Sequence, residues 1–318
     1  MANKKIGVKA SAQDNFIGPN CPTGVTASNV GTNRAYNDGA ITISWTAPTT
    51  GNTPIGYKVY NGASLLATVA YGTNSTTVGG LLSNTSYTLT VKSYDAYAEC
   101  AGVNANAVTV TTVPQAPTIG TATNTGSGRP YNNGAATITY TAGADGGSSV
   151  TTFTATASAG GYTATGTSPI TVTGLQSNTA YTFTVTATNA NGTSTASSAS
   201  NSITATTVPN TPGAPSVSTV AIGGSAAQGS ANTATDTVSW SAPADGGSGI
   251  TNYYWACSDG KTGNTTSTSV AVSQESGTAQ TYTVRADNAN GSSGTSSASA
   301  SITSAFSFTP FSVFGFSP

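Results

Sequence analysis

Hydrophobic and polar residues alternate along most of this chain. In AITISW, at 40–45, single polar residues separate Ile41, Ile43 and Trp45, and YTFTVTA at 181–187 alternates in the same way. A period of two is typical of antiparallel strands that bury one face. Clusters of Gly, Asn, Asp and Pro interrupt the runs roughly every eight to twelve residues, which favours a sandwich or a barrel. No stretch carries the apolar stripe of an amphipathic helix, so the sequence predicts an all-β protein.

One unit occurs three times along the chain. YNDGAITISWTAP at 36–48 returns as YNNGAATITYTAG at 131–143, and LLSNTSYTLTV at 81–91 returns as LQSNTAYTFTV at 175–185. TDTVSWSAPADGGSGI at 235–250 begins a third copy. The spacing of roughly 95 to 100 residues is the length of a small domain. We therefore predict an N-terminal arm, three domains (copies 1, 2 and 3) and a C-terminal segment, at 1–20, 21–113, 114–208, 209–305 and 306–318.

The residues of copy 1 resemble a fibronectin type III domain, a seven-stranded sandwich of the immunoglobulin-like class. ISWTAP resembles the second strand of that family, with Trp45 as the core tryptophan, and PIGYKVY resembles the third strand. Leu81 and Tyr87 match the family's Leu-x5-Tyr corner, in which a tyrosine hydroxyl bonds to backbone while the ring fills the core. In copy 2, Tyr140 stands at the tryptophan position.

The corner differs among the other copies. Copy 2 keeps it with Leu175 and Tyr181. In copy 3, Trp240 is retained and Tyr282 is interpreted as the corner tyrosine, but Ser276 stands where the leucine is expected. The resemblance implies three tandem β-sandwiches and says little about function, because one fold hosts many functions.

Composition excludes several classes of function. Only 6% of the residues are charged and the net charge is −1, so no basic surface for nucleic acid is expected. No apolar run reaches the length of about eighteen residues that favours a membrane span, so no membrane insertion is expected. The chain starts MANKKIGVKASAQDNF, in which no apolar segment follows the basic residues. We therefore expect no export signal and synthesis in a cytoplasm.

The sequence offers little for catalysis. It contains no histidine, which removes the commonest general base and the commonest metal ligand. The ten acidic residues are spread along the chain, and Asp145 and Asp245 begin Asp-Gly-Gly segments that are typical of turns. The serines lack a neighbouring base that would activate them. We expect a protein that is not an enzyme and that takes no metal or cofactor.

Two groups of residues are candidate sites. Cys21 and Cys100 lie in copy 1, and the fibronectin resemblance implies that the start of the first strand and the last loop share one pole, where the two thiols could form a disulfide. The alternative is that both stay reduced. Tyr253, Tyr254 and Trp255 are consecutive, so at least one points outward from a strand. They form either a core with one exposed ring or a platform on which a sugar ligand stacks.

The C-terminal segment FSFTPFSVFGFSP is unusually aromatic for this chain. It follows the last predicted sandwich, and Pro310 prevents it from continuing a central strand. It either folds back on copy 3 or docks into another protein as an extended peptide. We predict an assembly anchor that binds further copies of the chain or other virion proteins, made by Phe306, Phe308, Phe311, Phe314 and Phe316.

These features favour a structural protein of a bacteriophage virion, of the capsid-decoration or fibre type. Tandem immunoglobulin-like modules with an anchoring tail resemble such proteins, which assemble in the host cytoplasm and need no export signal. The resemblance implies modules displayed on the particle exterior, in homo-oligomers, with adhesion to cell-surface carbohydrate as a further role. The alternative is a bacterial extracellular or cell-wall protein in which fibronectin type III modules serve adhesion or spacing.

Overall fold

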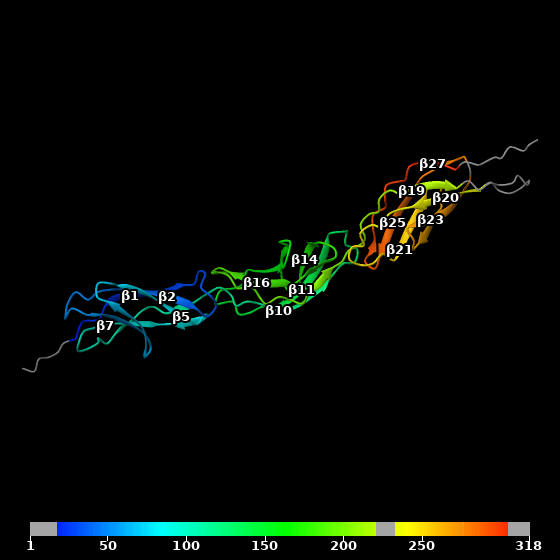
Figure 1. The fold of residues 1–318 in the computed structure, drawn as a ribbon. Helices are drawn as coiled ribbons and strands as arrows, with labels where there is room; N and C mark the ends of the chain where they lie inside the picture. Colours follow the sequence, from blue (N-terminus) through cyan, green and yellow to red (C-terminus); the bar gives the residue numbers. More distant parts are fainter. Residues whose placement is uncertain (1–17, 221–232, 276, 305–318) are drawn as a thin grey trace, which may run out of the picture. The chain divides into compact units, whose positions relative to one another are not determined.

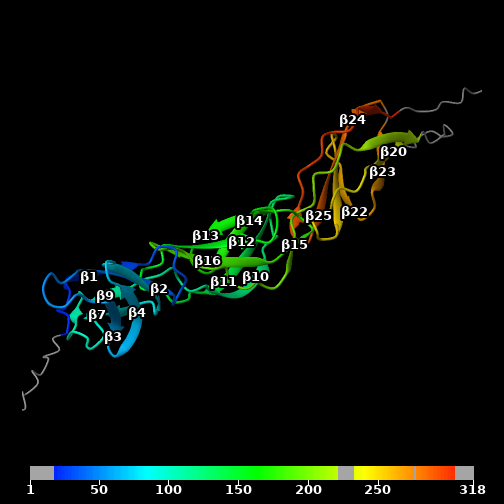
Figure 2. The same ribbon diagram turned by 60° about the vertical axis from the view of Figure 1, so that its left-hand side comes forward.

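The computed structural model of the chain describes residues 18–220, 233–275 and 277–304. Every regular element in these ranges is a β-strand, which confirms the predicted all-β class (Figures 1 and 2). The five predicted anchor phenylalanines and most of the predicted N-terminal arm lie outside the described residues.

Two compact units divide the chain, and each is described by itself. Unit 1 contains copy 1 and one end of copy 2, and unit 2 contains the rest of copy 2 and copy 3. This division does not test the predicted domain boundaries, which stay a prediction. Unit 1 comprises Met1–Pro117, Ala142–Phe153 and Thr186–Ala196, and unit 2 comprises Thr118–Thr141, Thr154–Val185 and Ser197–Pro318.

Copy 1 forms three antiparallel sheets, with strand orders β1-β2-β5, β4-β3-β7-β8 and β6-β9. The strands are β1 (Thr23–Val30), β2 (Gly39–Thr46), β3 (Gly56–Asn61), β4 (Ser64–Ala70), β5 (Ser75–Leu81), β6 (Thr85–Tyr87), β7 (Leu89–Tyr94), β8 (Val103–Asn104) and β9 (Val108–Val110).

Copy 2 repeats this set, with orders β10-β11-β14, β13-β12-β16-β17 and β15-β18. Its strands are β10 (Thr118–Asn124), β11 (Gly134–Thr141), β12 (Thr152–Ala157), β13 (Thr163–Thr165), β14 (Ile170–Leu175), β15 (Thr179–Tyr181), β16 (Phe183–Asn189), β17 (Gly192–Thr193) and β18 (Ile203–Ala205).

Copy 3 repeats it again, with orders β19-β20-β23, β22-β21-β25-β26 and β24-β27. Its strands are β19 (Ser216–Val220), β20 (Thr233–Ser239), β21 (Asn252–Cys257), β22 (Thr262–Thr265), β23 (Ser269–Glu275), β24 (Ala279–Gln280), β25 (Tyr282–Asn288), β26 (Gly291–Ser292) and β27 (Ile302–Thr303).

The core of each copy lies between the inner faces of its sheets. In copy 1 the alternating residues Ile41, Ile43 and Trp45 of β2 are buried, and the Trp45 ring lies 5.0 Å from the ring of Tyr57 on β3. Trp240 and Tyr253 make the same contact in copy 3, at 5.5 Å between ring centres. Burying one face of each strand is what the period of two in the sequence predicts.

Serine recurs at every third position between β17 and β18 in copy 2 and between β26 and β27 in copy 3. In copy 2 the buried hydroxyls of Ser194, Ser197 and Ser200 accept hydrogen bonds from backbone N–H groups of β16. The same serines donate their own N–H groups to β16 carbonyls. The serine segment therefore gives hydrogen-bond partners to the backbone N–H and C=O groups of β16, and buried backbone groups require such partners. The equivalent serines of copy 3 are Ser293, Ser296 and Ser299.

The tyrosine corners of copies 1 and 2 have the geometry that the resemblance implies. The Tyr87 hydroxyl accepts a hydrogen bond from the backbone N–H of Leu82 at 3.0 Å. The Tyr181 hydroxyl accepts one from the N–H of Gln176 at 3.1 Å. Each bond fixes the loop that precedes the strand carrying the tyrosine.

Copy 3 has no tyrosine at its corner, and the interpretation of Tyr282 as the corner residue is wrong. The N–H of Tyr282 donates to Ser299 Oγ, just as the N–H of Phe183 donates to Ser200 Oγ. Tyr282 therefore takes the position of the core residue Phe183, which lies two residues further along the chain than the corner.

Gln280 occupies the corner position instead. It pairs with Ile302 of the last strand, as Tyr181 pairs with Ile203 in copy 2. Ser276, which the sequence places at the corner leucine, lies outside the described residues.

Candidate functional site

A buried asparagine ties together three backbone segments in unit 1. Asn189 is 5% exposed, and its Nδ2 donates to the carbonyl oxygens of Thr112 and Asp145, both at 2.8 Å, and of Ser148 at 3.1 Å. Its Oδ1 accepts the N–H of Asn191 at 2.8 Å, and Asn191 Nδ2 reaches Thr112 O at 3.1 Å. The side chain thereby joins the end of copy 1 to two turns of copy 2.

The same arrangement occurs in unit 2. Asn288 Nδ2 donates to the carbonyl oxygens of Thr207 at 2.8 Å, Asp245 at 2.7 Å and Ser248 at 3.2 Å. Its Oδ1 accepts the N–H of Asn290 at 2.8 Å. We call these two sets of contacts the asparagine clamps.

Sequence reasoning missed the clamps, although it singled out the segments that form them. Asn189 pairs with Gly192, so Ala190 and Asn191 are the turn residues of the hairpin that carries the clamp. At the position equivalent to Asn189, copy 1 has Asp95. A carboxylate cannot donate hydrogen bonds to carbonyl oxygens, so copy 1 lacks the clamp side chain.

The loops around Asp95 are held in other ways. Asp95 Oδ1 accepts the N–H groups of Tyr97 and Ala98, each at 2.9 Å, and these bonds lower the pKa of the Asp95 carboxyl. Cys21 and Cys100 form a disulfide with 5.3 Å between their Cα atoms. The structure thus brings together the start of the first strand and the last loop of copy 1.

A cluster of charged and aromatic side chains lies on the four-stranded sheet of copy 1. Lys58 Nζ is 2.6 Å from Glu99 Oε1 and 4.8 Å from the centre of the Tyr94 ring. Lys92 lies over the Tyr60 ring, and the Tyr60 hydroxyl donates to Glu99 at 3.0 Å. The hydrogen bond from Lys58 lowers the pKa of the Glu99 carboxyl. These groups satisfy one another, which is typical of cross-strand pairs that stabilise a sheet.

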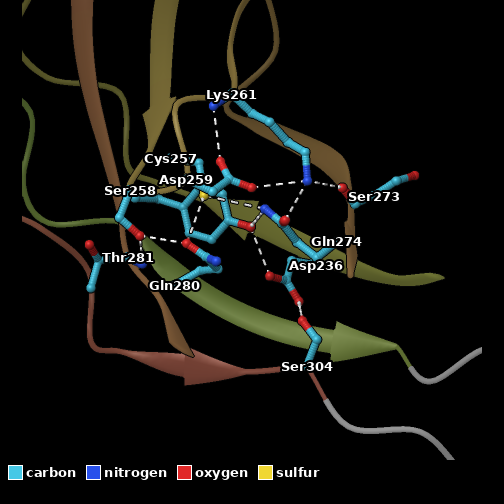
Figure 3. A network of polar contacts seen from close by, with 11 residues as sticks. Asp236, Cys257, Ser258, Asp259, Lys261, Ser273, Gln274, Gln280, Thr281 and Ser304 are labelled. Atoms are coloured by element: carbon cyan, nitrogen blue, oxygen red, sulfur yellow. Dashed lines mark hydrogen bonds and ion pairs between the residues drawn. The ribbon is translucent and has the colours of Figure 1, made fainter. Parts of the chain in front are cut away.

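A buried carboxylate in copy 3 replaces an apolar core residue. Asp236 is fully buried, at the position that Ile41 occupies in copy 1. It accepts hydrogen bonds from the hydroxyls of Thr219 at 2.7 Å, Tyr282 at 2.8 Å and Ser304 at 3.1 Å. Figure 3 shows the bond between Asp236 and Ser304. Burial, together with the bond to this carboxylate, raises the pKa of the Tyr282 hydroxyl.

The polar contacts continue towards the surface of copy 3. Gln274 Nε2 donates to the Tyr282 hydroxyl at 2.7 Å and lies 3.3 Å from Cys257 Sγ. Lys261 Nζ donates to Gln274 at 2.7 Å and lies 2.9 Å from Asp259 (Figure 3). Each of these side chains has a hydrogen-bond or ion-pair partner within the protein, so the network needs no ligand to satisfy its buried polar groups.

The three consecutive aromatic residues Tyr253, Tyr254 and Trp255 do not share one face of their strand. Tyr253 is buried in the core, as alternate residues of a strand require. Tyr254 points to the other face, where the guanidinium of Arg285 lies 4.8 Å from its ring centre. Trp255 is half-buried, and its ring covers Gly263 on the neighbouring strand.

The described residues contain no group of three or more His, Cys, Asp and Glu side chains that could hold a metal ion. Nor does the described part of the chain include a helix long and apolar enough to cross a membrane.

Comparison with known proteins assigns two of the copies to a family. Residues 22–101 and 126–203 match the family model described as "Fibronectin type III domain". These two segments are fibronectin type III domains. The assignment agrees with the three sheets and the tyrosine corner that both copies contain.

Two relatives are bacterial hydrolases. The chain is 34% identical over 302 residues to exoglucanase B of Cellulomonas fimi, a match that covers 90% of this chain and 25% of that protein. It is 37% identical over 116 residues to chitinase A1 of Niallia circulans, covering 36% of this chain and 15% of that protein. The chain thus spans about a quarter or less of each relative.

A solved structure of the FN1–FN3 domains of chicken CNTN1 is 15% identical, with 90% of this chain and 99% of that chain covered. Its TM-score of 0.31 is too low for the likeness to bear on fold or function.

These relatives overturn the virion assignment. The expected capsid-decoration or fibre protein, located on a phage particle, is wrong, because the similar proteins are a bacterial exoglucanase and a bacterial chitinase. The expectation depended on the start of the chain, and a segment that spans a quarter of its relative gives no information about how the whole protein is targeted. The fibronectin fold occurs in many settings and could not correct the error.

Proposed function

We propose that this chain is a non-catalytic fibronectin type III segment of a bacterial extracellular protein that acts on polysaccharide. Its role is to connect and space the parts of that protein that bind or cleave the polysaccharide. The observation that carries the proposal is the 302-residue match to exoglucanase B, which covers 90% of this chain. Chitinase A1 shares part of the same segment. Two enzymes named for different substrates share this segment, which favours a role common to both over recognition of one substrate.

The chemistry of the chain supports a non-catalytic role. The sequence contains no histidine. The carboxylates of Asp145 and Asp245 are engaged in turns, where each accepts the N–H of the glycine two residues on at 2.8 Å. Asp236 is buried and bonded to three hydroxyl groups.

The asparagine clamps support a role in spacing. Domains joined by a short linker move relative to one another unless specific contacts restrict them. Asn189 and Asn288 each bond to the last residues of the preceding copy and to turns of their own copy. Each clamp therefore restricts bending where one copy meets the next. A spacer needs this restriction if it is to hold the parts on either side of it at a fixed separation.

The location of the protein tests this proposal. An antibody against copy 1 is applied to fractions of a culture of the producing bacterium: cytoplasm, membranes, cell wall and medium. We expect the protein in the wall or the medium. Detection only in the cytoplasm, or in purified phage particles, would overturn the proposal. A cytoplasmic enzyme measured in each fraction controls for lysis.

A further inference from the structure

Three loops of copy 1 meet at the pole where its first strand begins. The N–H of Ile55 donates to Tyr94 O at 2.8 Å, and the N–H of Tyr71 donates to Ile55 O at 3.1 Å. The carboxylate of Asp95 bonds to the side chain of Asn52. These contacts connect the loops that follow β2, β4 and β7, and we call the resulting surface the loop pole. Loops on a rigid sandwich are where binding residues are most often found.

Large apolar side chains are exposed at the loop pole. Tyr97 is 72% exposed, Ile55 is 54% exposed and Tyr71 is 49% exposed. The Tyr71 ring is stacked on the buried ring of Tyr57, with 6.5 Å between centres and 28° between planes. In copies 2 and 3, threonine occupies the position of Ile55. Exposed apolar side chains gathered at one pole indicate an interaction site.

A hollow of about 410 Å³ lies beside Tyr71 and is lined by uncharged residues of 47–54. Its volume falls in the range of about 300–1,000 Å³ that is usual for ligand sites. The lining combines one aromatic ring with the hydroxyls of threonines and the amide of Asn52. Such a lining suits a neutral ligand that has both apolar and hydroxyl-bearing faces.

The loop pole is held in shape without a clamp. The Cys21–Cys100 disulfide joins its two outer segments, and Gly102 N–H donates to Cys21 Sγ at 3.2 Å. The Asp95 carboxylate fixes the turn that presents Tyr97. A surface that is already ordered loses little conformational entropy when it binds, and this favours affinity.

We propose that the loop pole of copy 1 binds an uncharged polysaccharide of hexopyranose rings, a glucan or chitin. The C–H face of a pyranose ring packs on an exposed aromatic ring, while its hydroxyl groups bond to amides and hydroxyls beside it. Tyr97 and Tyr71 supply the rings, and Asn52 with the neighbouring threonines supplies the polar groups. The choice of ligand rests on the proposed function, because the relatives are an exoglucanase and a chitinase.

The experiment measures how much of the full-length chain is removed from solution by microcrystalline cellulose and by insoluble chitin. Tyr97→Ala and Tyr71→Ala are compared with Leu82→Ala, a matched control because Leu82 is 55% exposed and lies beyond the opposite end of β5. We expect binding to at least one polysaccharide, about fivefold or more weaker in each tyrosine variant and within about twofold of wild type in the control. Binding should be the same at about 0.1 M and about 1 M NaCl, since the ligand is uncharged.

The inference is wrong if the wild-type chain stays in solution with both polysaccharides. It is also wrong if the tyrosine variants bind as strongly as wild type, or if Leu82→Ala weakens binding as much as the tyrosine substitutions do. Binding that salt abolishes would point to charged groups and would also overturn it. Circular dichroism and thermal unfolding of each variant exclude misfolding, and Tyr97→Ala removes a ring that is 72% exposed. A chain found outside the cell that binds neither polysaccharide overturns this inference and leaves the proposed function standing.

Discussion

Replacing Asn288 by alanine should destabilise copy 3 by about 1.5–4.5 kcal/mol. The side chain is 7% exposed, and its amide makes contacts of 2.8, 2.7 and 3.2 Å to three carbonyl oxygens while its oxygen accepts one N–H. An amide has two hydrogens, so two donated bonds and one accepted bond are lost, each worth about 0.5–1.5 kcal/mol net.

Urea unfolding followed by tryptophan fluorescence measures this loss. Trp240 and Trp255 report on copy 3 and Trp45 reports on copy 1, so a destabilised copy 3 gives a transition that separates from the one of copy 1. Because several domains unfold, each transition is fitted separately. Asn264→Ala removes an exposed asparagine of the same copy and should stay within about 0.5 kcal/mol of wild type.

Asn288→Asp sharpens the test, because it keeps the shape and removes the donors. At neutral pH its carboxylate would face three carbonyl oxygens, so the variant should be at least as unstable as Asn288→Ala. Acidification restores one O–H donor and should recover part of the loss. The clamps do not stabilise their junctions if the free energy of unfolding of Asn288→Ala lies within about 0.5 kcal/mol of the wild-type value. The same conclusion follows if the free energy of unfolding of Asn288→Asp equals that of the control Asn264→Ala.

Further predictions concern copies 1 and 3. Trp45→Ala should destabilise copy 1 by about 3–5 kcal/mol in the same urea assay, because the ring is 5% exposed and a cavity replaces it; a loss below about 1 kcal/mol would contradict its core position. Replacing Cys21 and Cys100 by serine should cost about 4 kcal/mol in calorimetry, since the bridge spans 79 residues; an unchanged melting temperature would contradict this. Burial would raise the pKa of Asp259, but hydrogen bonds and charge from Lys261 lower it to about 2. The ionised Asp259 carboxylate should contribute less than about 1 kcal/mol to the stability of copy 3, because its pair with Lys261 is partly exposed. This contribution should be complete above pH 4 and lost as pH falls through about 2. In Lys261→Met most of this pH-dependent loss of stability should disappear.

The strands were predictable because burial leaves a direct mark on the sequence. Ile41, Ile43 and Trp45 are buried in turn along β2, so their period of two is a consequence of facing one core. The recurrence of that pattern three times also predicted three sets of sheets. The serine segments left no such mark, because a polar residue at every third position resembles an exposed linker, although Ser197 is buried.

The corner of copy 3 could not be assigned from the sequence pattern. Tyr282 and Gln280 are two residues apart in the sequence, so a period of two fits either of them and does not show which one occupies the corner. The rule that core positions are apolar also failed, because Asp236 is buried with three hydroxyl partners that come from distant segments. Only the fold brings those partners together.

The clamps were not predictable for a similar reason. Asn189 and Asn288 bond to backbone carbonyl oxygens, which every residue possesses, so their partners carry no signature in the sequence. The disulfide could be anticipated only from the family resemblance, since spacing alone left reduced thiols as an alternative. The exposed rings of the loop pole depend on which pole of the sandwich each loop reaches, which also needs the fold.

The measurement that tests the central claim most directly is hydrolysis of an insoluble glucan by exoglucanase B in which this chain replaces the aligned segment. A spacer should keep activity on the insoluble glucan within about twofold of the parent, whereas deletion of the segment should lower it, and neither change should affect a soluble substrate. If the exchanged enzyme is as impaired as the deletion, or if deletion has no effect, the chain is not a spacer of this kind.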